Sequence, residues 1–107
     1  MSRFGPALFV SRADVAAITE AEQNEILTHV RSAATRLGLT RLTPRLHDRD
    51  PETVGVLLLS EHGYHHMPDE IREEQDQAWA AQALRVGAEV DRHVPGVYRF
   101  TAYTVED

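Results

Sequence analysis

Two short stretches of the chain are apolar at consecutive positions, without the alternation of a strand that has one face in water. They are residues 7–10 and residues 54–59. Apolar runs of this length, bounded by polar turns, are typical of central strands that are buried on both faces. We therefore expect a sheet with these two strands at its centre. The chain's own helices can cover one face, and the second face then needs a partner subunit, a ligand or another protein.

A helix with one apolar face is predicted between these two strands. Thr19 followed by Glu22 has the spacing of a capping box, so the helix should begin near Glu20. Apolar residues then recur every three or four positions as far as Leu37. Gly38 supplies the left-handed residue that commonly ends a helix.

A second amphipathic helix is predicted after the second apolar strand. Pro68 is favoured as a first helical residue, and the acids that follow it suit the positive end of the helix dipole. Pro95 and Gly96 should end this helix. Gly87, in the middle of it, is expected to allow close packing against a neighbouring element.

Two further segments alternate between apolar and polar residues, as half-buried strands do. They are residues 40–47, where Pro44 favours an edge strand, and residues 97–105. The polar turn at residues 48–52 contains Pro51 and should join the first of these to the apolar strand 54–59 as a hairpin.

The resulting order, βαββαβ, predicts a single α+β domain over residues 1–107. With right-handed crossovers it gives a ferredoxin-like fold, a four-stranded antiparallel sheet with two helices on one face and spatial strand order 4-1-3-2. Strands one and three are central in that order. These are the two strands that the apolar runs independently place there, so pattern and topology agree.

The sheet face away from the helices is the first candidate binding surface. Its predicted centre is apolar, and its rim carries Arg41, Arg45, His47, Arg99, Thr101 and Tyr103. An apolar centre with a rim of Arg and Tyr is typical of protein interfaces, and a twofold homodimer is the commonest way to cover such a face. The architecture resembles that of dimeric α+β-barrel proteins, which stack two sheets around a ligand cavity. This resemblance implies a fold and does not carry a function.

Composition narrows the class of partner. The net charge is −6, from 17 acids against 11 bases, so nucleic acid and anionic membranes are not expected to bind directly. All the bases are arginine, which together with frequent alanine indicates a GC-rich bacterial coding genome. There is no cysteine, and the apolar run near the start is too short for a signal peptide or a membrane span, so a cytoplasmic protein is expected.

Reactive side chains are densest just before the second helix. Glu61, His62, His65 and His66 lie there, and imidazole can bind metals or move protons near neutral pH. The spacing does not match a helical zinc site, however, and no distant fourth ligand is evident. Phosphate-binding glycine loops and nucleophile motifs are also absent from the sequence. We therefore predict no metal and no cofactor, and the sequence assigns no catalytic residue.

The leading hypothesis is a small acidic bacterial protein that binds another protein, as an inhibitor, an immunity protein or an adaptor. A basic partner would suit the acidic start of the second helix, which carries Asp69, Glu70, Glu73 and Glu74. The alternative is a homodimeric α+β-barrel enzyme or small-ligand binder with a cavity between two sheets. A third possibility is a structural subunit of a phage or bacterial assembly.

Overall fold

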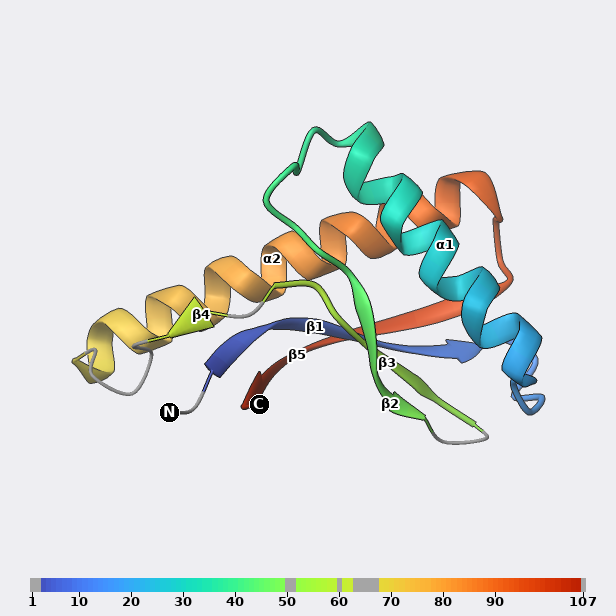
Figure 1. Cartoon of the computed structure of the whole chain (residues 1–107), viewed down its shortest axis with the longest axis horizontal. Coiled ribbons are helices and arrows are strands. Elements are labelled where there is room, and N and C mark those ends of the chain that lie inside the picture. Colours follow the sequence, from blue (N-terminus) through green and yellow to red (C-terminus); the bar gives the residue numbers. More distant parts are fainter. Residues whose placement is uncertain (1–2, 50–51, 60, 63–67, 107) are drawn as a thin grey trace.

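The computed structural model describes residues 3–49, 52–59, 61–62 and 68–106. Its elements follow one another as β1 (Arg3–Arg12), α1 (Glu20–Arg36), β2 (Arg45–Arg49), β3 (Val54–Leu57), β4 (Glu61–His62), α2 (Asp69–His93) and β5 (Tyr98–Glu106). Figure 1 shows the two helices packed over the strands, with α2 crossing the whole length of the sheet.

Strand β1 is the centre of the sheet. It pairs with β3 and with β5, and β3 pairs in turn with β2, all in the antiparallel sense. Phe4 of β1 has two partners, Glu61 of β4 and Glu106 of β5, so these two strands lie on opposite edges of β1. Strand β4 therefore follows β3 along the same edge, and the path of the sheet is β2-β3-β1-β4 with β5 also on β1.

The predicted α+β class, with an antiparallel sheet and two helices, is confirmed. The strand path differs from the ferredoxin-like order expected from the sequence, because it runs to β4, a short strand within the predicted loop. The second strand was also predicted too early, over residues 40–47. It begins at Arg45, because Leu42 N–H bonds back to the Leu39 carbonyl in a turn and Pro44 has no N–H to donate.

Both helices form where the sequence predicts them. The Thr19 hydroxyl accepts the Glu22 N–H at 3.2 Å and caps α1, and Gly38 takes φ 72° just beyond its end. Helix α2 begins after Pro68 and carries both acids of its first turn in solvent. In the part of the chain that the structure describes, neither helix is long and apolar enough to cross a membrane.

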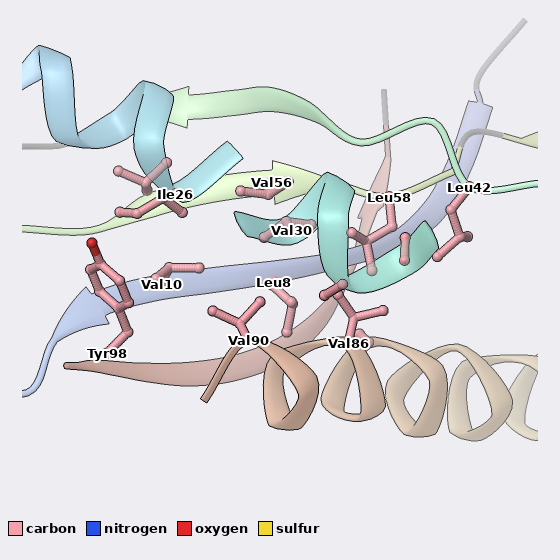
Figure 2. Close-up of a cluster of buried hydrophobic side chains, with 14 of the residues drawn as sticks. Leu8, Val10, Ile26, Val30, Leu42, Val56, Leu58, Val86, Val90 and Tyr98 are labelled. Carbon is pink, nitrogen blue, oxygen red and sulfur yellow. The ribbon is translucent and has the colours of Figure 1, made fainter. Parts of the chain in front are cut away.

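The main core lies between the sheet and the helices (Figure 2). Leu8 and Val10 of β1 and Val56 of β3 face it, where they meet side chains of α1 such as Val30 and side chains of α2 such as Val86. Every residue of β3 is buried, as its apolar run predicts. The alternation of strand side chains then sends the other residues of β1 and β3 to the opposite face.

That opposite face has a small apolar cluster of its own. Ala7, Leu57 and Val105 are 0%, 2% and 5% exposed, and Tyr103 packs against them. The ring of Tyr103 also stacks on Phe9, with 3.9 Å between ring centroids and 8° between planes. Ala7, Leu57 and Val105 are thus buried within one copy of the chain, whereas Phe9 and Tyr103 are partly buried. Part of the second face is covered without a partner, and a partner on the rest of it stays a prediction.

Candidate functional site

Arg45 and Tyr103, two residues predicted on the rim of the open sheet face, lie on the two edge strands of the sheet. One row of partners crosses the sheet, from Arg45 through Leu57 and Ala7 to Tyr103. Neighbouring strands are about 4.8 Å apart, so three spacings separate Arg45 from Tyr103 by about 14 Å. The sheet holds these two predicted site residues at opposite edges, with buried apolar residues between them.

The other predicted rim residues lie in three different places. His47 is exposed in β2, at the point where the register shifts between Leu46 and Asp48. Arg99 is exposed on β5, opposite Ser11 of β1. Arg41 is not in the sheet, because residues 40–44 precede β2. Arg45 and His47 on β2, and Arg99, Thr101 and Tyr103 on β5, thus lie on the two edge strands, as the predicted rim requires, whereas Arg41 lies outside the sheet. The binding role of this face stays a prediction.

The acidic start of α2 is a separate and protruding surface. Residues 69–78 include no buried residue, and Figure 1 shows this part of the helix extending beyond the beginning of β1. The segment carries five acids and one base: Asp69, Glu70, Glu73, Glu74 and Asp76 with Arg72. Arg72 forms an ion pair with Asp69. Ile71 is 50% exposed in the same segment, which adds an apolar side chain to the acidic surface.

A groove lies between α1 and the chain that leads into β2. It has a volume of about 720 Å³. Its lining residues are Arg31, Ala34 and Thr35 of α1, together with Leu39, Thr40, Leu42, Thr43, Pro44 and Arg45. We call this the α1 groove. The two walls are joined by a hydrogen bond of 3.2 Å, in which Arg31 Nε donates to the carbonyl of Pro44.

A second hollow of about 380 Å³ adjoins the α1 groove, since Leu42 lines both. Arg41 lines this second hollow, across from Gln75, Trp79 and Gln82 of α2. The two hollows together bring three arginines, Arg31, Arg41 and Arg45, to one side of the molecule. Two of them belong to the predicted set, and Arg31 was missed.

The charge around the α1 groove is opposite to that of the whole chain. Residues 26–47 contain four arginines and two histidines and no acid, although the chain has 17 acids. Arg36 forms an ion pair with Glu89 of α2 at 3.0 Å. The acid-free stretch is the signal that could have found this groove in the sequence. It was missed because Arg41 had been placed on a strand together with Arg45.

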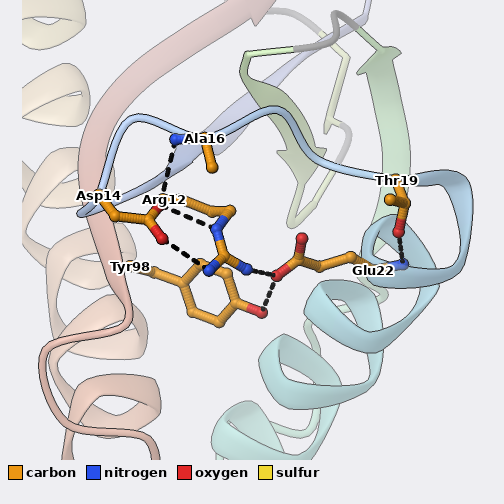
Figure 3. Close-up of polar contacts among 6 residues, drawn as sticks. All are labelled: Arg12, Asp14, Ala16, Thr19, Glu22 and Tyr98. Atoms are coloured by element: carbon orange, nitrogen blue, oxygen red, sulfur yellow. Dashed lines mark hydrogen bonds and ion pairs between the residues drawn. The ribbon is translucent and has the colours of Figure 1, made fainter.

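A second polar cluster joins β1, α1 and β5 (Figure 3). Arg12 binds both carboxylate oxygens of Asp14, at 2.9 and 2.8 Å, and reaches Glu22 at 2.5 Å. The Tyr98 hydroxyl donates to the same Glu22 oxygen at 3.2 Å. Glu22 was predicted to complete a capping box, but its carboxylate bonds to Arg12 and Tyr98 instead.

The electrostatics of this cluster argue for a structural role. The bonds from Arg12 lower the pKa of Asp14 to about 2. Burial raises the pKa of Tyr98 to about 12, and the nearby Glu22 carboxylate adds to this effect. Groups that titrate so far from neutral pH exchange no protons under ordinary conditions, so neither suits general acid–base catalysis. The cluster fixes the start of α1 against the sheet.

The structure also bears on metal binding. Among the described residues, no group of three or more histidine, aspartate or glutamate side chains is arranged to hold a metal ion. The histidine-rich segment, which the sequence offered as a candidate metal site, falls largely outside the described residues. His65 and His66 lie outside the described residues, and only the backbone pairing of His62 with Arg3 is described.

Comparisons with known proteins leave the site to be judged on its own chemistry. No protein-family model, no curated protein and no solved structure gave a significant match to the chain. The α1 groove, the larger of the two hollows described, combines charge, hydrogen-bond donors and apolar surface. Guanidinium groups and threonine hydroxyls can donate hydrogen bonds to carboxylates, so the groove is suited to an anionic group attached to an apolar one.

Proposed function

We propose that this protein acts by binding another protein, and that the α1 groove receives an acidic segment of that partner. The observation that carries the proposal is the acid-free stretch of residues 26–47, which surrounds a groove in an otherwise acidic chain. An electropositive groove on a negative protein concentrates binding at one place, because anionic segments are repelled elsewhere on its surface.

The lining of the groove supports a peptide segment as its occupant. Leu39, Leu42 and Pro44 offer apolar contacts, and Arg31 and Arg45 lie at its walls. The bond from Arg31 Nε to Pro44 fixes the position of this guanidinium and leaves its two terminal nitrogens to donate to a ligand. A positioned guanidinium binds a carboxylate with less loss of side-chain entropy than a flexible lysine would.

We also infer that the sheet is a ferredoxin-like sheet with one addition. Strand β1 lies between β3 and β5, and β2 lies beyond β3, which supports the predicted 4-1-3-2 arrangement for the four longer strands. Strand β4 then counts as a short extension beside β3, on the same edge of β1. In this arrangement the α1 groove lies at the edge of the sheet formed by β2.

A binding titration tests the proposed function. A fluorescently labelled Glu-rich peptide is titrated with the protein, and its anisotropy is followed at low and high salt. We expect saturable binding that weakens with salt, and at least tenfold weaker binding when Arg31→Gln and Arg45→Gln are combined, because hydrogen bonds to charged groups contribute about 1.5–3 kcal/mol each.

The matched control is Arg99→Gln, which removes an exposed arginine from β5, the edge strand opposite β2. It should leave the affinity unchanged. Equal weakening by the control and the groove variant would refute the assignment of the site. Tight binding of citrate or phosphate with the same dependence on Arg31 and Arg45 would also overturn the proposal, since it would make the groove a small-anion site.

A further inference from the structure

We infer that the acidic segment bound by the α1 groove comes from a second copy of this chain, and that it is the protruding start of α2, residues 69–78. This inference rests on the proposed function and names its partner. The same chain carries both halves of a complementary pair of surfaces. One is a stretch with four arginines and no acid, and the other has five acids and one base.

The groove is not filled by the chain's own α2. Its lining residues come from α1 and from residues 39–45, and none comes from α2. The first residues of α2, 69–74, line neither hollow, and none of them is buried (Figure 1). From Gln75 onward the helix meets its own molecule, where Gln75 and Ala78 line the second hollow and Thr104 of β5 donates to Asp76 at 3.2 Å. Glu70, Glu73 and Glu74 lie in the exposed part, and no α2 residue lines the α1 groove of the same molecule, so the contact that we infer is made between two molecules.

The protruding segment has the form of a ligand for a groove. Glu70, Glu73 and Glu74 lie three and four positions apart, so their side chains share one face of the helix. All three are exposed, and Ile71 beside them is half exposed. An amphipathic helix that lays such a face into a groove is a recurrent mode of recognition. Here the carboxylates would meet the arginines, and Ile71 would meet the apolar floor.

Symmetry favours a closed dimer. Each copy has one α1 groove and one acidic helix segment, so two copies related by a twofold axis can exchange both contacts at once. The paired contacts reinforce each other, because the second forms within an assembled complex at high effective concentration. A homodimer was predicted from the sheet face, and the charge distribution now supports self-association through the helices instead.

A charge-swap experiment tests this inference. One variant reverses the helix segment (Glu70→Arg, Glu73→Arg, Glu74→Arg), and another reverses the groove side (Arg31→Glu, Arg41→Glu, Arg45→Glu). Sedimentation velocity follows the mass of each protein alone and of an equimolar mixture. In either variant both surfaces have the same sign, so each alone should be monomeric. In the mixture both contacts regain opposite signs, so the dimer should return.

The wild-type protein should be a dimer at low salt and should dissociate at about 1 M salt, where the Debye length is about 3 Å. We expect each reversal to weaken self-association at least tenfold and Arg99→Glu, the control on β5, to leave it unchanged. Circular dichroism confirms that each variant is folded. If the groove variant unfolds, the same mixing test is made with Arg31→Glu alone against Glu73→Arg alone.

The outcomes separate this inference from the proposed function. In one outcome the wild-type protein stays monomeric at high concentration and low salt but binds the Glu-rich peptide through Arg31 and Arg45. This result refutes the inferred self-association and supports the proposed function of the groove. A dimer that survives both reversals and high salt also overturns the inference. Failure of the peptide to bind, together with a monomer, refutes both. Recovery of the dimer only in the mixture supports both.

Discussion

Gly87 lies where α2 crosses β5, and the structure leaves no room there for a side chain. A Cβ atom built at this position would lie 2.9 Å from Cγ of Phe100, 3.1 Å from its Cβ and 3.3 Å from its Cδ1. Carbon atoms prefer separations of about 3.5–4.0 Å, so the helix or the ring must move to accept a methyl group. We therefore predict that Gly87→Ala destabilises the protein.

Two opposing terms set the size of this effect. Replacing Gly by Ala inside a helix stabilises it by about 1 kcal/mol. Overpacking a well-packed core costs about 1–3 kcal/mol. The clash should exceed the propensity gain, because the atoms that must yield belong to a ring packed on the main core. We expect a net loss of about 1 kcal/mol, or a Tm lower by about 4 °C for a domain of this size.

Urea unfolding measures this change, with the fluorescence of Trp79 as the signal, since it is the single tryptophan and is 5% exposed in α2. Ala88→Gly, at an exposed position of the same helix, calibrates the propensity term. In a Phe100→Ala background two of the three close atoms are absent, so Gly87→Ala should become neutral or stabilising. If Gly87→Ala alone raised stability by the amount that Ala88→Gly lowers it, the close approach of α2 to β5 would be refuted.

Three further predictions concern strain and charge. Val15 is 85% exposed and has a φ of 56°, in the left-handed region that a β-branched residue resists and asparagine accepts. Val15→Asn should therefore raise the Tm, and an unchanged Tm would show that the backbone is not strained at this position. Burial raises the pKa of Tyr98 from 10.0 to about 12. The protonated hydroxyl therefore stabilises the folded state fully below pH 10, and this stabilisation is lost as the pH rises from 10 to 12. Alkaline unfolding should therefore depend less on pH in Tyr98→Phe, and an unaltered profile would disprove this. The hydrogen bond from Arg36 lowers the pKa of Glu89, so its stabilisation is present above the ordinary pKa of 4.5 and is lost as the pH falls through the lowered value. Glu89→Gln should lower the Tm at pH 7 and reduce the loss on acidification, whereas a Tm equal to that of the wild type at both pH values would argue against the pairing.

Local signals in the sequence were sufficient for much of the fold. The apolar run at residues 54–59 predicted a strand buried on both faces, and β3 is one. Thr19 and Gly38 predicted the ends of α1 to within two residues, because a cap acts through backbone atoms close by in the sequence. Strand β4 was not predicted, because two residues carry no periodicity and depend on pairing with β1, distant in sequence.

The candidate site was harder to predict than the fold. Arg41 and Arg45 were recognised, but an error at the start of β2 put Arg41 on the sheet. The role of Arg31 depends on α1 lying beside Pro44, a contact between segments that no local pattern encodes. The acid-free stretch was visible in the sequence throughout. The stretch indicates a binding site only because the fold gathers its residues around one groove, since surface charge is otherwise spread over all sides of a domain.

Burial on both faces of the sheet determines where this protein can bind. A chain of 107 residues has limited apolar side chains, and here Ala7, Leu57 and Val105 of the second face are buried within one copy. When a partner binds, an apolar surface that is already buried loses little further contact with water, so it contributes little free energy to binding. The binding that we propose depends instead on two exposed surfaces, the basic groove beside β2 and the acidic helix segment beyond β1. Contacts of this kind are salt-sensitive and reversible, so the proposed association should weaken as the salt concentration rises.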